Sequence, residues 1–460
     1  MDMNLQKVSL VVLILFVLSC GSSEVEEHLS KAGDFRSQGE WQKEIEQYEL
    51  ALGSDKTNAE IWYLKAIALG EIGSEEDVLL SLNNAIKYDG NHVGARYERA
   101  RIRWQSGLAI EVIEDLNVVL DFNSSNSEAF HLRGRAYGSI GEHSLAIQDL
   151  GFAINLNSSN KEYYLTRATA KIKTDQIISA RDDLSKAIEL DPSCAIAYYN
   201  RAGVYALLEE VDLSLNDYSV ALDKDPENKI YLRDRGVASR LAGKLDNAIN
   251  DLTEVIDAGL GDGITYFERG NSYYEKNEIG LAILDYDQAI MLAPDIADYY
   301  LNRGHAWNDL GQYDRSFDDY DVSLTLNPQL DEAYGGKGIA LAFMGLYDQA
   351  VQEFDQAIRI SPGYTSYYMD RGQIFVRMQL YEKAYADFGE AIRTFPQYVP
   401  AYLNRAIVAS VLGFDDQSES DLIVAEELGA SKVSLNDVRK RIGDIKMSKV
   451  ASVDEEIQFY

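Results

Sequence analysis

A fixed spacing of 34 residues between prolines is the feature that most constrains the fold of this chain. Six of its seven prolines stand 34 residues, or twice 34, from the next one in the series: Pro192, Pro226, Pro294, Pro328, Pro362 and Pro396. A constant period of this length indicates a repeat architecture, in which each repeat packs on the next. Twelve consecutive 34-residue repeats fit into residues 25–432 without an insertion or a deletion.

Each repeat predicts two antiparallel helices joined by a short turn. With place 1 of repeat 1 at Val25, place 8 is Ala or Gly in every repeat, and two helices must come close there because a larger side chain would push them apart. Place 15 is Gly in eight repeats, as expected of a left-handed residue just after a helix. Places 24 and 28 are large and apolar in nearly every repeat, and a spacing of four puts them on one buried face. Proline near the end of the repeat stops the second helix.

One repeat shows all of these features in the segment YFERGNSYYEKNEIGLAILDYDQAIMLAP, residues 266–294. This segment resembles the tetratricopeptide repeat, whose signature places here hold Tyr266, Gly270, Tyr273, Ala282, Tyr286, Ala289 and Pro294. The resemblance extends over residues 25–432. It implies an all-α fold, a right-handed superhelical solenoid of helix-turn-helix units. It also implies a concave surface, lined by the first helix of each repeat, that binds extended peptides or helices of partner proteins.

Place 7, where this family usually has Leu, is basic in all twelve repeats. In the nine repeats where it is Arg, place 23 is always Asp, and both places are equally far from the turn at place 15. An antiparallel hairpin should bring them level, so that Arg and Asp can form two parallel hydrogen bonds. We predict a ladder of structural ion pairs that includes Arg133 with Asp149, Arg167 with Asp183, Arg201 with Asp217, Arg269 with Asp285, Arg303 with Asp319, and Arg371 with Asp387. The alternative is a row of arginines that binds a ligand, which is less favoured because each Arg already has a local acid.

The first twenty residues predict a targeting segment. Lys7 precedes an apolar run at residues 8–18, which is too short to span a bilayer as a helix but suits a secretion signal. The next residues, VLSC at 17–20, resemble the lipobox of bacterial lipoproteins. This resemblance implies a lipoprotein signal peptide at residues 1–19 and a lipid on Cys20, with residues 20–24 as the lipidated N-terminus and a short tether. An ordinary signal peptide with a chance Cys is the alternative.

The residue after Cys20 helps to predict which membrane the protein is anchored to. Gly21 stands where, in enteric bacteria, an Asp is associated with retention at the inner membrane. The expected location is therefore the bacterial cell envelope, with the protein anchored to a membrane as a lipoprotein, and the outer membrane is favoured.

Nothing in the sequence indicates an enzyme. The five histidines show no spacing typical of a metal site, and the glycine-rich GLGDG at residues 259–263 has no preceding strand to make it a phosphate-binding loop. We therefore expect no catalytic residue, no metal and no cofactor. The net charge of −32 also argues against a nucleic-acid partner, because binding to phosphates depends on Lys and Arg.

A basic strip in repeats 3 to 5 is the candidate binding site. Spacing places its residues on one face of successive first helices: Tyr97, Arg101 and Trp104, then His131 and Arg135, with Lys173 nearby. Such a strip suits an acidic peptide, a carboxylate terminus or an anionic glycan. The alternative is that these long side chains merely cover apolar surface with their stems.

These features together predict a non-catalytic envelope lipoprotein that acts as a scaffold for protein or peptide partners and contacts the membrane only through its lipid. The alternative is a role in exopolysaccharide export or glycan binding, because the chain holds 30 tyrosines, some in doublets such as Tyr163-Tyr164, Tyr299-Tyr300 and Tyr367-Tyr368. Residues 433–460 are expected to form a C-terminal capping helix and a loose tail, because an open solenoid end needs a polar cap.

Overall fold

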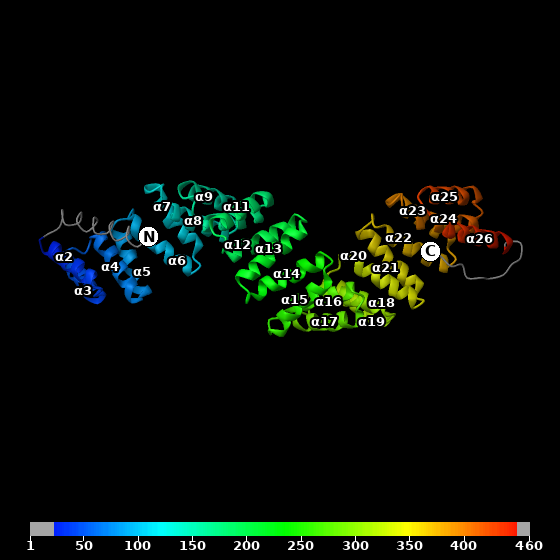
Figure 1. Ribbon diagram of the computed structural model, residues 1–460, viewed down its shortest axis with the longest axis horizontal. Coiled ribbons are helices and arrows are strands. Elements are labelled where there is room, and N and C mark those ends of the chain that lie inside the picture. Colours follow the sequence, from blue (N-terminus) through cyan, green and yellow to red (C-terminus); the bar gives the residue numbers. More distant parts are fainter. Residues whose placement is uncertain (1–22, 449–460) are drawn as a thin grey trace. The chain divides into compact units, whose positions relative to one another are not determined.

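Residues 23–448 are described by the computed structural model, and every regular element among them is an α-helix (Figure 1). The chain divides into two compact units, an N-terminal unit that ends at Glu227 and a C-terminal unit that begins at Asn228. Each unit is an α-solenoid of consecutive helical hairpins. The predicted signal peptide, the proposed lipid attachment at Cys20 and the last twelve residues of the tail lie outside the described residues.

Each repeat contributes a first helix with an even label and a second helix with an odd label. The N-terminal unit contains α2 (Ser23–Gln38), α3 (Trp41–Ser54), α4 (Ala59–Ile72), α5 (Glu75–Tyr88), α6 (Val93–Gln105), α7 (Ala109–Phe122), α8 (Ser127–Ser139), α9 (His143–Leu156), α10 (Lys161–Lys173), α11 (Ile177–Leu190), α12 (Ala195–Leu207) and α13 (Val211–Lys224). The C-terminal unit contains α14 (Lys229–Leu241), α15 (Leu245–Asp257), α16 (Gly263–Glu275), α17 (Ile279–Leu292), α18 (Ala297–Asp309), α19 (Tyr313–Leu326), α20 (Asp331–Phe343), α21 (Tyr347–Ile360), α22 (Thr365–Arg377), α23 (Tyr381–Thr394), α24 (Val399–Leu412), α25 (Asp415–Glu427) and α26 (Lys432–Ser448).

The turn between the two helices has the same backbone conformation in all twelve repeats. The eight glycines at place 15 have positive φ, and so do the four residues that replace Gly there: Asp175, Glu209, Asn277 and Gln379. These four have φ between 59° and 62°. The hairpin therefore imposes a left-handed residue at place 15 even where the side chain disfavours it.

Close approach of the two helices explains the small residues at place 8. A Cβ added at Gly372 would lie 2.7 Å from Cε1 of Phe388, and one at Gly270 would lie 2.8 Å from Cε1 of Tyr286. Real Cβ atoms do not come this close, so the aromatic ring at place 24 occupies the space that a side chain at place 8 would need. Four of the six repeats with an aromatic residue at place 24 have Gly at place 8.

The C-terminal helix α26 covers the open end of the last hairpin. Its apolar residues Leu435, Val438 and Ile442 are buried in one cluster with Leu403 and Ile407 of α24. This contact removes from water the apolar face that a thirteenth repeat would otherwise cover.

Replacing Gln379 by Gly should stabilise the protein. A left-handed conformation costs a residue with a Cβ about 1 kcal/mol more than it costs Gly. We expect Gln379→Gly to raise the free energy of unfolding by about that amount in urea denaturation followed by circular dichroism. Gln379→Ala is the matched control, because it keeps the Cβ and should give little gain. An equal gain from both variants would contradict this explanation.

Candidate functional site

All nine Arg–Asp pairs of the ladder have the same two-bond geometry. In repeat 8, Arg269 donates from Nε to Oδ2 of Asp285 at 2.8 Å and from Nη2 to Oδ1 at 2.7 Å. The same paired bonds join Arg99 to Asp115, Arg133 to Asp149, Arg167 to Asp183, Arg201 to Asp217, Arg235 to Asp251, Arg303 to Asp319, Arg371 to Asp387 and Arg405 to Asp421. All nine aspartates are buried, so each charge is removed from water and neutralised by its own arginine.

Most of these arginines also reach the preceding repeat. Nη1 of Arg269 donates to Oγ1 of Thr253 at 3.0 Å, and Thr253 stands at place 25 of repeat 7. Equivalent bonds at place 25 are accepted by Asn83, Asn117, Ser185, Asp287 and Asp355. The place-7 arginine therefore ties its own two helices together and fixes the register of adjacent repeats. Its donors are used within the fold, which argues against the alternative of a ligand-binding arginine row.

Aromatic rings contact most of the same guanidinium groups. Arg269 lies 5.8 Å from the ring centroid of Tyr266 and 5.8 Å from that of Tyr273. The tyrosine doublets follow the same arrangement: Tyr163-Tyr164, Tyr299-Tyr300 and Tyr367-Tyr368. In each doublet the second tyrosine stands at place 4 of its repeat, as Tyr266 does, and the first tyrosine is buried. The hydroxyls of Tyr300 and Tyr368 donate to the carbonyl oxygens of Pro294 and Pro362. In these doublets, on which the glycan alternative rested, every tyrosine except Tyr300 is buried, and Tyr300 is partly exposed.

Removing one partner of a ladder pair should cost more stability than removing both. Asp285→Ala leaves the guanidinium of Arg269 without its carboxylate, and we expect a loss of about 3 kcal/mol in the free energy of unfolding. The double variant Arg269→Met, Asp285→Leu removes both charges and should lose less than Asp285→Ala alone. Urea denaturation of the two variants and the wild type checks this. A double variant that is less stable than Asp285→Ala would show that the pair itself contributes the stability.

The basic strip of repeats 3 to 5 is only partly assembled. Arg135 lies 4.8 Å above the ring of Trp104, and His131 lies 4.8 Å from the ring of Tyr163. Arg101, Arg135 and Lys173 are exposed, whereas His131 is half-buried and contacts Oγ1 of Thr166 through Nε2 at 3.1 Å. Burial, with a smaller effect of Arg135, lowers the pKa of His131 to about 4, so this ring is neutral near pH 7.

Two acids join the strip and reduce its positive charge. Arg101 donates to Oε2 of Glu98 at 2.8 Å, and the hydroxyl of Tyr97 donates to Oε2 of Glu128 at 3.1 Å. The sequence pattern left out both glutamates because Glu98 stands at place 6 and Glu128 at place 2, whereas the strip was defined on places 5, 9 and 12. The strip is therefore a mixed surface with exposed cations at Arg135 and Lys173.

A pocket of about 520 Å³ lies on the first helices of repeats 7 to 10, within the C-terminal unit. We call it the acidic pocket; it is lined by Arg240, Phe267, Glu268, Asn271, Tyr274, Glu275, Asp298, Leu301, Asn302 and Glu332. These residues come from α14, α16, α18 and α20. One pocket thus draws side chains from four successive repeats, as a surface for an extended ligand would.

Hydrogen bonds hold one wall of the acidic pocket in place. Arg240 donates to Oε2 of Glu268 at 2.8 Å and to Oε1 of Glu275 at 2.7 Å. Oδ1 of Asn271 accepts from the hydroxyl of Tyr286 at 2.9 Å and from Nδ2 of Asn302 at 2.8 Å. The wall is preorganised because these bonds cross from α14 to α16 and from α16 to α18.

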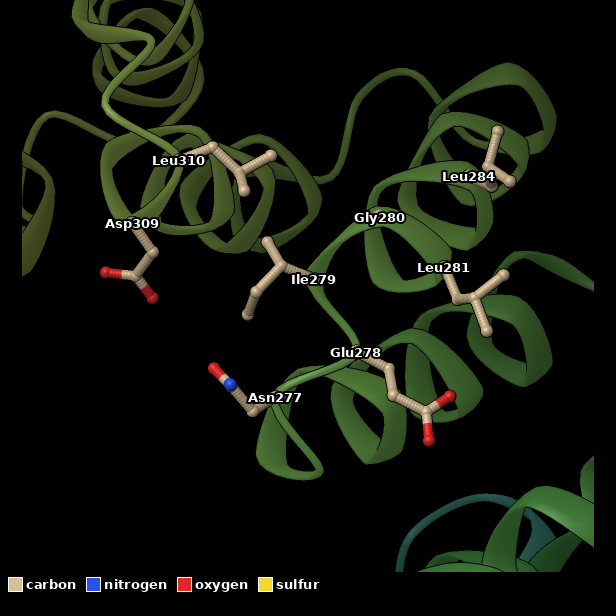
Figure 2. Close-up of a pocket in the computed structure, with 8 residues that line it drawn as sticks. All are labelled: Asn277, Glu278, Ile279, Gly280, Leu281, Leu284, Asp309 and Leu310. Atoms are coloured by element: carbon tan, nitrogen blue, oxygen red, sulfur yellow. The ribbon is translucent and has the colours of Figure 1, made fainter.

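A second, more open hollow adjoins the acidic pocket at the turn of repeat 8. It is lined by Asn277, Glu278, Ile279, Gly280, Leu281, Leu284, Asp309 and Leu310 (Figure 2). The hydroxyl of Tyr274, in the acidic pocket, donates to Oδ2 of Asp309 at 2.6 Å. Burial, and then this bond, raises the pKa of Tyr274 well above its usual range, so the phenol stays protonated as the donor.

The sequence pattern did not identify the acidic pocket. Its polar residues stand at places 2, 6, 9, 12 and 13, which differ from repeat to repeat and therefore show no period. Reading these places together across repeats 7 to 10 would have collected Glu268, Glu275, Asp298 and Glu332.

Within residues 23–448, no group of three or more His, Cys, Asp or Glu side chains is arranged to hold a metal ion. In the same range, no helix combines the length and the apolar character that crossing a membrane requires.

Comparisons with known proteins identify the repeats. A family model described as TPR repeat matches residues 270–307, and two models described as tetratricopeptide repeat match residues 165–229 and 331–364. No curated protein matches the sequence.

Several solved structures align with this chain at low sequence identity and with TM-scores below 0.5. The Cut9-Hcn1 structure is 13% identical over 94% of this chain and 99% of that chain, with a TM-score of 0.44. The P58(IPK) TPR domain is 17% identical over 78% of this chain and 99% of that chain, with a TM-score of 0.36. MamA from Desulfovibrio magneticus RS-1 is 17% identical over 38% of this chain and 98% of that chain, with a TM-score of 0.35.

Proposed function

The chain is a tetratricopeptide repeat protein, and from this premise we propose that it is a non-catalytic scaffold that binds partner proteins at a bacterial envelope membrane, to which a lipid on Cys20 anchors it. The observation that carries the binding role is the acidic pocket, which draws polar side chains from four successive first helices. A surface of this kind contacts an extended segment of a partner at several points, and each repeat adds its own contacts.

The anchor is supported by the order of features in the first twenty residues. A basic residue, an apolar run of eleven residues, a small residue and Cys20 follow one another as in bacterial lipoproteins. A lipid with several acyl chains holds a protein stably at a bilayer, whereas a single chain binds only marginally. Such an anchor would leave the whole repeat array free to bind partners, and Gly21 favours the outer membrane as its location.

Lipid attachment can be tested directly on the two cysteines of the chain. In a bacterial host that processes lipoproteins, we expect the wild type to incorporate radiolabelled palmitate and to sediment with membranes. Cys20→Ser should lose both properties, because it removes the thiol to which diacylglycerol is attached. Cys194→Ser is the matched control, since Cys194 is a buried free thiol within the repeats, and should keep both. Label retained by Cys20→Ser would refute the anchor.

The basic strip provides a test of where partners bind in the N-terminal unit. In the wild type, the exposed cations of the basic strip should attract acidic segments of partner proteins. We therefore expect the triple variant Arg101→Glu, Arg135→Glu, Lys173→Glu to lose partner proteins that the wild type captures by crosslinking in the native envelope. The control variant Lys56→Glu, Lys87→Glu, Lys186→Glu makes the same charge change at exposed residues outside the strip and should keep them. Mass spectrometry identifies the captured proteins. If the strip variant and the control variant capture the same set of proteins, the basic strip binds no partner.

A further inference from the structure

The acidic pocket carries more negative charge than its own cation can neutralise. Four carboxylates line it, and the guanidinium of Arg240 bonds only to those of Glu268 and Glu275. Asp298 and Glu332 are exposed, and their carboxylates form no hydrogen bond or ion pair with any described residue. An unpaired carboxylate on a concave surface raises the local concentration of cations, so the pocket favours a positively charged ligand.

A second, independent feature points to a ligand that also accepts hydrogen bonds. Asn271 lines the acidic pocket with only 9% of its surface exposed. Its Oδ1 already accepts two hydrogen bonds, which fixes the orientation of the amide, and its Nδ2 donates to no described residue. The two bonds to Oδ1 hold the amide in one orientation at the pocket wall, so its N–H groups can donate to a ligand there.

Apolar residues complete the pocket. Phe267 and Leu301 line it beside the carboxylates. A lysine or arginine side chain fits such a surface, because its aliphatic stem packs on apolar groups while its charge reaches an acid.

We propose that the acidic pocket binds a lysine- or arginine-bearing segment of a partner protein, with Asp298 and Glu332 pairing with its cations and Nδ2 of Asn271 donating to a backbone carbonyl. This inference rests on the proposed scaffold function and names the chemistry of the partner. A peptide can supply both cations for the unpaired carboxylates and a carbonyl oxygen for Asn271, whereas a polyamine has cations but no hydrogen-bond acceptor. A bound metal ion is not supported, because the described residues contain no suitable cluster of ligands.

The test measures binding of a fluorescein-labelled peptide of alternating lysine and serine to the purified mature chain by fluorescence anisotropy. We expect saturable binding that weakens as salt rises, and no binding of the same peptide with glutamate in place of lysine. Asp298→Lys with Glu332→Lys should weaken binding by about tenfold or more, because both unpaired carboxylates become repulsive. Both residues are exposed, so the fold should tolerate the change.

The matched control is Asp318→Lys with Asp348→Lys, which makes the same charge change at exposed residues on second helices α19 and α21. This variant should bind within about twofold of the wild type, because the lost charges are on another face. An equal loss in both variants would overturn the proposal, since it would show that the peptide responds only to the net charge of −32.

Two further measurements address the role of Asn271. Asn271→Ala, checked for folding by circular dichroism, should weaken binding of the lysine peptide by about threefold or more, because it removes the hydrogen-bond donor. Spermine should compete for the pocket more weakly than the peptide does. Unchanged affinity in Asn271→Ala, or spermine as effective as the peptide, would overturn the assignment of a peptide backbone.

Failure of this proposal is distinguishable from failure of the scaffold function. If the peptide does not bind while partners are still captured from the envelope by the wild type, the scaffold function stands and the chemistry assigned to this pocket is wrong. If no partner is captured and no peptide binds, both are wrong.

Discussion

A paired arginine and aspartate hold nine of the twelve hairpins of this protein in one register. Arg303 shows the arrangement: it bonds to Asp319 in the second helix of its own repeat and to Asp287 in the preceding repeat. Because Asp319 is buried, a hairpin that slipped by one residue would leave a carboxylate in the interior without its partner. The pair therefore specifies how helices and repeats align, while apolar packing at places 8 and 24 supplies most of the burial.

This arrangement makes the protein a chain of nearest-neighbour contacts. Each arginine of the ladder bonds within its own repeat, and most of them also bond to the repeat before it. Each first helix packs against its own hairpin partner and its neighbours in sequence. Stability is then close to a sum of repeat and interface contributions within each compact unit. The helix α26 closes the C-terminal unit by burying Leu435 and Val438, where no further repeat follows.

Some places of the repeat have a structural role and others vary between repeats, and this difference explains where binding surfaces can arise. Places 7, 8, 15, 23 and 24 serve the hairpin, so they change little from repeat to repeat. Places 2, 5, 6, 9, 12 and 13 on the first helices are free to differ, and they form the acidic pocket in one unit and the basic strip in the other. The strip is less basic than its own residues suggest, because Glu98 and Glu128 lie beside Arg101 and Tyr97. Chemical specificity in this protein is therefore a property of neighbouring repeats read together.

The sequence by itself determined the repeat length, the all-α fold, the turn at place 15 and the pairing of Arg269 with Asp285, because these depend on a period and on contacts within one hairpin. It did not reveal that Gln379 adopts a left-handed conformation, since its side chain disfavours one and only the packed hairpin imposes it. The acidic pocket was also decided by tertiary structure. Asn271 and Glu332 are 61 positions apart in the chain, and they line one pocket only because consecutive first helices stack. Periodicity predicts what every repeat shares, and the stacking of repeats decides which of their differing side chains meet.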